Sequence, residues 1–282
     1  MSLKECIFDS NSERKLYTHL DSIWKNQFDI YPNLPFTKVF DIDSLNVDSY
    51  EKSFLYKTNI DYTVCDNNGK PKMCIEFDGM SGGYSRGGHY IQIKGDTDRK
   101  WKLELKLRIA MEHGFPFYVV SFPEKEFLSE RIHLTVLDGI IGQTIAYLQV
   151  PKALGEAVES QRELLESLPD DERHKFFQEM ITSVEVEEEF RWDPITQAWA
   201  HASQTLREKG IEVWPVPQPF LPSGQTDWRK CEVKCSTSKG EVSALVWVRN
   251  FEGSKAIPSL IAENIARLIA YHKVAKLYGI DL

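Results

Sequence analysis

Two acidic side chains interrupt the apolar run CIEFDG at residues 74–79. Glu76 and Asp78 are two residues apart, so a β-strand would point both carboxylates to the same face. Burying unpaired charge is costly, so solvent, a cationic side chain or a metal ion must balance these groups. The chemistry that this pattern could support is the binding of a hard divalent cation by carboxylate oxygens.

A predicted hairpin brings a third acid to the same place. The segments NIDYTVCD and KPKMCIEFD read as strands joined at Asn68-Gly69, and a type I′ turn there would set Asp61 opposite Glu76. Asp78 would share their face, and the crowded carboxylates predict a site for Mg²⁺ or Mn²⁺. An acidic edge that faces water is the alternative. The opposite face would be an apolar core face, with Ile60, Tyr62, Val64, Met73, Ile75 and Phe77.

A fourth acid, Glu13, lies in a predicted N-terminal helix. The stretch SNSERKLYTHL has a capping box, with Ser10 as the cap and Glu13 three residues later. Glu13 also precedes Leu16 and Leu20 by three and seven residues, so it shares the apolar stripe of this helix. Its carboxylate could therefore close the cap, face the acidic site, or do both in part.

The densest basic segment, DRKWKLELKLRI, follows the acidic one after a glycine-rich loop. Its alternating apolar residues are typical of a strand, but its length favours a helix from residues 96–98 to Gly114. In either form it predicts contacts to phosphates, and a charged outer face is the alternative. Its basic residues are Arg99, Lys100, Lys102, Lys106 and Arg108.

The rest of the chain predicts a second, smaller α/β part. FPFYVVSF reads as a buried strand, and residues 151–190 form an acidic, glycine-poor helical connector. After it come a helix with an Asp-Pro start, three strands and a closing helix. We therefore expect an α/β fold with domains at 1–150, 151–190 and 191–282. The second part also contains an isolated E-x-K, Glu232 and Lys234, which we interpret as a chance match or a degenerate copy because Asp227 precedes it too closely.

The order of these segments resembles the PD-(D/E)XK nuclease superfamily, in the branch of very-short-patch-repair-like endonucleases. The resemblance covers about residues 10–125 and depends on SERKLYTHL, the hairpin with Asp61 and Glu76, and the charged helix that ends at EHGFPFYVVSF. It implies a restriction-endonuclease-like mixed sheet flanked by helices. It also implies Asp61 and Glu76 as catalytic ligands of Mg²⁺ or Mn²⁺, with Glu13 as an accessory acid.

The sequence departs from the family at two positions. Asp78 stands where the superfamily usually has Lys, so it could complete the metal's coordination, and Lys100, Lys102 or Lys106 would supply the catalytic cation. The family's His is matched only by His89, beyond the inserted glycine loop. Arg99, Lys106 and Arg108 of the basic segment would contact nucleic acid.

The overall composition restricts the possible classes of function. The net charge of −8 disfavours a basic coat, no apolar run is long enough to span a membrane, and five scattered cysteines indicate a reducing, cytoplasmic setting. The expected function is metal-dependent endonuclease-like hydrolysis of nucleic acid, most plausibly DNA. The alternatives are a catalytically silent nuclease-fold binding protein and a toxin, immunity or defence component that recognises a protein partner through its second part.

Overall fold

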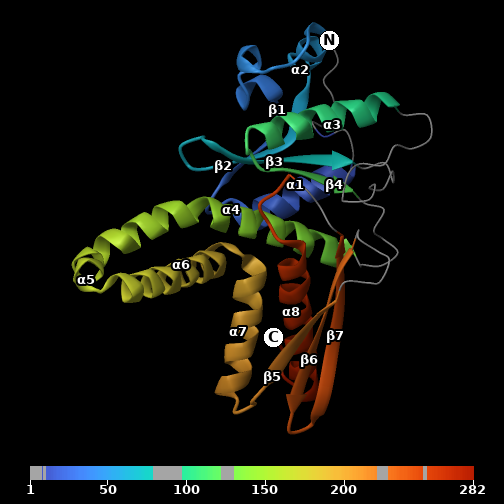
Figure 1. Ribbon diagram of the computed structural model, residues 1–282. Helices are drawn as coiled ribbons and strands as arrows, with labels where there is room; N and C mark the ends of the chain where they lie inside the picture. The colour runs from blue at the N-terminus through green and yellow to red at the C-terminus, as the bar shows by residue number, and fades with distance from the viewer. Residues whose placement is uncertain (1–7, 9–10, 79–96, 122–129, 221–227, 250–252) are drawn as a thin grey trace. The chain divides into compact units, whose positions relative to one another are not determined.

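The computed structural model describes residue 8 and residues 11–78, 97–121, 130–220, 228–249 and 253–282 (Figure 1). Its contacts divide the chain into two compact units, residues 1–134 with 251–254, and residues 135–250 with 255–282. Each unit has its own sheet covered by helices, which confirms the predicted α/β class. Within the described ranges, no helix combines the length and apolar character needed to cross a membrane. The domain limits predicted from composition stay predictions.

Unit 1 is built on a mixed four-stranded sheet in the order β1-β2-β3-β4. The first three strands are antiparallel, whereas β4 runs parallel to β3, so α3 forms the connection between them. Its elements are α1 (Asn11–Trp24), β1 (Asp29–Pro35), α2 (Ser49–Leu55), β2 (Asn59–Cys65), β3 (Pro71–Asp78), α3 (Thr97–Glu112) and β4 (Phe117–Ser121), with 3₁₀ turns at Phe36–Lys38 and Ile42–Ser44.

Helices cover both faces of this sheet, with α1 and α3 on opposite sides (Figure 1). On the α1 side, the Tyr62 hydroxyl donates to the backbone carbonyl of Glu13 at 2.8 Å. Ile60 and Tyr62 are both buried, and the unbroken β1–β2 register between them keeps the two residues on one face of β2, as expected. One hydrophobic cluster of buried residues comprises Phe36, Phe40, Ile42, Leu45, Leu55, Ile60, Cys74, Leu103, Leu105, Ile109, Ala110, Phe117 and Val119.

The predicted register of the β2–β3 hairpin is confirmed, although its turn differs. Tyr62 pairs with Ile75, and continuing that register sets Asp61 opposite Glu76. At the turn, however, Asp66 accepts a hydrogen bond from Gly69 N–H and pairs with Lys70, and Gly69 alone of the Asn-Gly pair has positive φ, 74°. The loop is thus one residue longer than a type I′ turn, and a bulge after Val64 restores the register.

The basic segment forms helix α3, so the helical interpretation is confirmed and the strand alternative is wrong. The helix stops at Gly114, whose φ of 62° ends the turn, as the sequence predicts. Leu103, Leu105 and Ile109 are buried although the sequence alternates with period two. Their burial gives α3 a fixed face toward the sheet and thereby fixes which of its lysines point inward.

Unit 2 combines long helices with a three-stranded antiparallel sheet, β5-β6-β7. Helix α8 packs on one face of this sheet, against buried residues that include Cys231, Val233 and Val246. The segment 151–190 is helical, as expected. The elements are α4 (Glu130–Ser160, which starts in unit 1), α5 (Arg162–Ser167), α6 (Asp170–Trp192), α7 (Pro194–Glu208), β5 (Trp214–Phe220), β6 (Trp228–Thr237), β7 (Gly240–Arg249) and α8 (Pro258–Leu277).

Glycines let α4 approach the junction between α6 and α7 closely. A Cβ on Gly142 would lie 2.6 Å from Asp193 Cα, and one on Gly139 would lie 2.7 Å from Ile195 Cδ1. Asp193 caps α7 by accepting the Ile195 N–H at 2.9 Å, and Pro194 follows it, which confirms the predicted Asp-Pro start. This packing places the inner face of α4 beside α6 and α8.

Candidate functional site

A buried ion pair lies at the centre of the predicted site in unit 1. The Lys106 ammonium on α3 donates to Glu76 Oε1 on β3 at 2.6 Å and to the Asn59 carbonyl, also at 2.6 Å. Both side chains are only 7% exposed. Burial raises the pKa of Glu76 above its usual range, and the Lys106 ammonium opposes that shift. Because both ions lose their hydration, burying this pair costs more free energy than filling the same space with apolar side chains.

Asp61 on β2 lies beside this pair. Its Oδ2 accepts the backbone N–H of Phe77 on the neighbouring strand at 2.7 Å, which fixes the carboxylate across the β2–β3 ladder. Burial raises the pKa of Asp61, the Phe77 N–H and the Lys106 ammonium lower it, and Glu13 raises it by charge repulsion. The predicted meeting of Asp61 and Glu76 therefore holds in the structure.

These groups line one cavity of about 350 Å³. Glu13 from α1 and Arg99 and Lys102 from α3 line it together with the carboxylates, so acids and bases from four elements converge there. The other lining residues are Phe54, Thr58, Phe77, Leu103 and Lys106. Glu13 therefore faces the site; Ser10, its proposed capping partner, lies outside the described residues.

The basic residues of α3 are distributed differently from the expectation. Lys106, one of the three lysines expected to reach the acids and also expected to contact nucleic acid, is buried against Glu76, so it takes the first of these two roles. Lys102 lines the cavity and pairs with Asp98 at 2.5 Å. Lys100 pairs with Glu104 at 3.5 Å, and Arg108 pairs with Glu51 at 2.6 Å, so neither lines the cavity.

Two further predicted residues cannot be placed in this site. Asp78 is the last residue of β3, where it pairs with Ser121 of β4, and its side chain lies outside the described part. His89 also lies outside the described residues. In unit 2, Glu232 and Lys234 alternate with the buried residues of β6 and so point away from α8.

The donor set partly fits a divalent cation. Asp61 and Glu76 are hard oxygen donors on adjacent strands, and burial disfavours their charged forms unless a cation balances them. Among the residues that the structure describes, no group of three or more His, Cys, Asp or Glu side chains is placed to hold a metal ion. Glu13 lines the same cavity without completing such a group, so a bound ion would need Glu13 to move closer or a further ligand such as Asp78.

Comparison with known proteins adds no family to this geometry. No family model, no curated protein and no solved structure matches the chain. Function must therefore be argued from the site itself.

Proposed function

We propose that unit 1 is a metal-dependent phosphodiester hydrolase that acts on nucleic acid, most plausibly DNA, in a restriction-endonuclease-like fold. The observation that carries the proposal is the buried Glu76–Lys106 pair beside Asp61 in a cavity lined by two more cations. The element order, with one helix, three antiparallel strands of which the first two are separated by the short helix α2, then a helix and a parallel strand, supports the same interpretation.

Each side chain has a role in this proposal. Asp61 and Glu76 would hold Mg²⁺ or Mn²⁺ with Glu13 or Asp78, and the bound ion would supply an activated water and charge stabilisation at the phosphate. Lys106, fixed between Glu76 and the Asn59 carbonyl, positions a cation at the acids where the family's Lys is missing from β3. Arg99 and Lys102 would bind phosphate oxygens at the mouth of the cavity.

A specific observation favours a second candidate. Lys106 already supplies a positive charge to Glu76, and no three-ligand metal group occurs among the described residues. The same geometry would serve a nuclease-fold protein that binds nucleic acid or a protein partner without cutting it. That candidate needs no metal at the site.

Incubation of the purified full chain with single- and double-stranded DNA and RNA, with Mg²⁺ or Mn²⁺, separates the two. The hydrolase proposal expects metal-dependent products that chelator abolishes, no cutting by Asp61→Asn or Glu76→Gln, and a lower rate with Lys102→Ala. Glu112→Gln is the matched control, because this α3 acid is half-exposed and pairs only with Arg108 among the described residues. Intact substrates under every metal condition would contradict hydrolysis and favour the silent candidate.

A further inference from the structure

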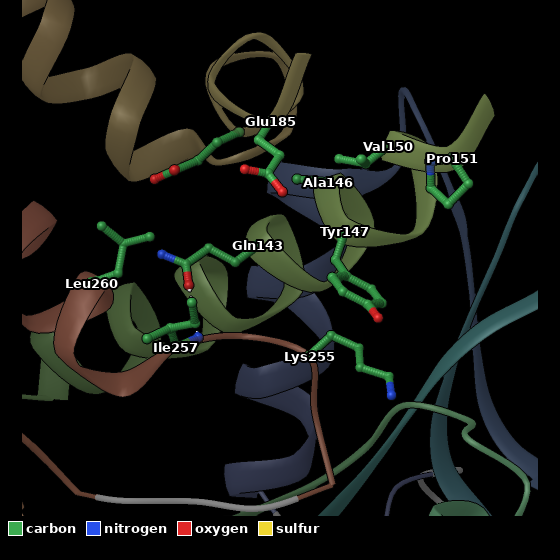
Figure 2. A pocket seen from close by; sticks show the side chains of 10 residues that line it. Gln143, Ala146, Tyr147, Val150, Pro151, Glu185, Lys255, Ile257 and Leu260 are labelled. Carbon is green, nitrogen blue, oxygen red and sulfur yellow. Dashed lines mark hydrogen bonds between the residues drawn. The ribbon is translucent and has the colours of Figure 1, made fainter. Parts of the chain in front are cut away.

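Unit 2 contains a second cavity, of about 430 Å³, none of whose lining residues lines the cavity of unit 1 (Figure 2). It is formed by α4, α6 and the start of α8 with the residues before it. Its size is within the range of small-molecule sites, and most of its wall is apolar. The apolar lining residues are Ala146, Val150, Pro151, Ile257 and Leu260.

One lining residue carries a buried polar group without a partner. Gln143 is only 6% exposed, and its Oε1 accepts the Ile257 N–H at 3.0 Å. Its Nε2 has no hydrogen-bond partner within the described residues. Figure 2 shows this nitrogen turned toward Leu260, on the side away from Ile257. Because a buried donor left unsatisfied costs about 1–3 kcal/mol, an acceptor group is expected in the cavity.

Charges of both signs lie on the cavity's rim. Glu185 and Glu189 come from α6, and Lys255 lies over the ring of Tyr147 with 5.6 Å between Nζ and the ring centroid. Figure 2 shows Glu185 and Lys255 on opposite sides of the opening, with Gln143 and Tyr147 between them. The site therefore offers carboxylates at one side and an ammonium at the other.

The acidic side is held in place by its own hydrogen bonds. Glu189 Oε1 accepts the Asn264 amide at 2.9 Å and the Thr196 hydroxyl at 3.3 Å. These bonds connect the cavity wall to the buried α6–α7 junction, so the carboxylate is positioned before any ligand arrives. Such a pre-formed arrangement reduces the ordering that binding must impose.

We propose that this cavity binds a small zwitterion with an apolar body, namely a free amino acid or a dipeptide with apolar side chains. The ligand's ammonium pairs with Glu185 and Glu189, and its carboxylate pairs with Lys255 on the other side of the opening. In the dipeptide, the peptide carbonyl accepts from Gln143 Nε2, which lies between them. The apolar wall receives its side chain. This site is independent of the nucleic-acid site proposed for unit 1.

The test is calorimetric titration of the full chain with L-leucine and L-leucyl-L-leucine, backed by saturation-transfer NMR for weak binding. Two analogues of leucine test the contributions of its two charged groups separately, because 4-methylpentanoate lacks the amine and 3-methylbutylamine lacks the carboxylate. Each should bind at least about tenfold more weakly than leucine, because each loses a charge-assisted interaction. Comparing leucine with the dipeptide shows which size of zwitterion the cavity prefers.

Substitutions of lining residues test whether the ligand binds in this cavity. Gln143→Glu keeps the acceptor for Ile257 N–H and replaces the unpartnered donor with an oxygen, so it should weaken binding about tenfold or more. Glu185→Gln and Lys255→Met, at less buried positions, should each weaken it and keep the test valid if Gln143→Glu unfolds. Glu187→Gln is the control, since this exposed α6 acid bonds to Ser183 and does not line the cavity.

Any one of three results would overturn the proposal. The first is the absence of saturable binding by both leucine and the dipeptide. The second is binding that Glu185→Gln and Lys255→Met leave unchanged, and the third is an analogue with one charge that binds as tightly as leucine.

Discussion

Each unit buries a carboxylate, and the two are balanced in different ways. Glu76 in unit 1 is paired with a full charge, the Lys106 ammonium at 2.6 Å. Asp193 in unit 2 is bonded to neutral donors: the Ile195 N–H at 2.9 Å, the Thr196 hydroxyl at 3.0 Å and the Asn264 amide at 3.3 Å. Burial raises the pKa of both carboxyls.

We interpret Asp193 as a structural acid and Glu76 as an acid of the proposed site. Asp193 caps α7, and its neutral partners account fully for its place in the fold. Glu76 caps no helix, and replacing a buried ion pair by apolar residues is often neutral or stabilising. The role proposed for this cavity therefore explains the Glu76–Lys106 pair better than a contribution to folding stability does.

The largest expected effect on stability comes from removing one partner of the Glu76–Lys106 ion pair. Lys106→Met should leave the Glu76 charge buried without its cation and lower the free energy of unfolding of unit 1 by about 3–5 kcal/mol. Urea unfolding, with hydrogen exchange of the β2 and β3 amides, measures this loss. The double variant Glu76→Gln/Lys106→Met removes both charges and should recover most of it. If the double variant is no more stable than Lys106→Met alone, the pair is not the cause.

A smaller effect is expected where α4 approaches Asp193. Gly142→Ala should destabilise unit 2 by about 1–3 kcal/mol, since the new Cβ would lie 2.6 Å from backbone Cα of Asp193 and 2.8 Å from the Trp192 carbonyl oxygen. Gly155→Ala is the matched control in the same helix, because no atom lies within 4 Å of its added Cβ. That substitution should stabilise slightly through helix propensity. Equal melting temperatures for the two variants would contradict the close packing.

The pH dependence of stability should report Asp193. Burial raises its pKa to about 6, against about 4 for an exposed Asp, so the folded state favours the protonated form. Its contribution to stability is therefore present at low pH and is lost as pH rises through about 6. Between pH 5 and 7.5 the wild type should lose about 1 kcal/mol relative to Asp193→Asn in urea titrations. A flat profile for Asp193→Asn against wild type would contradict the raised pKa.

The smallest effect concerns the bond that fastens α1 to the sheet beside the site. Tyr62→Phe removes the 2.8 Å hydrogen bond to the Glu13 carbonyl and should cost about 0.5–1.5 kcal/mol in thermal unfolding. If α1 positions Glu13 at the cavity through this bond, the same variant should also cut nucleic acid more slowly. Unchanged stability would show that the bond contributes nothing to holding α1.

Several elements, most of them in unit 1, could be predicted from local sequence patterns. The alternation of apolar residues around Asp61 and Glu76 fixed their register even though the turn at Gly69 has a different length. Gly114 marked the end of α3, and the Asp-Pro pair marked the start of α7. Each of these signals spans only a few residues, so no tertiary contact was needed to interpret it.

The contacts between distant parts of the chain that form the two sites could not be predicted from the sequence. Lys106 reaches Glu76 from 30 residues further along, and the period-two pattern of α3 hides which helical face is buried. The cavity of unit 2 gathers Gln143, Glu185 and Lys255 from three separate elements, with no shared motif. Such sites follow from how α3, α4, α6 and α8 pack, which the sequence pattern does not encode locally.

The most direct test of the central claim is differential scanning calorimetry with Mn²⁺. A cation that binds only the folded state at Asp61 and Glu76 stabilises by mass action, by about 2.7 kcal/mol at a hundredfold excess over its Kd. We predict that Mn²⁺ raises the melting temperature of wild type and Asp193→Asn alike, and that Asp61→Asn abolishes the shift. An equal shift in Asp61→Asn, or no shift in wild type at any Mn²⁺ concentration, would contradict a metal site at the buried acids of unit 1.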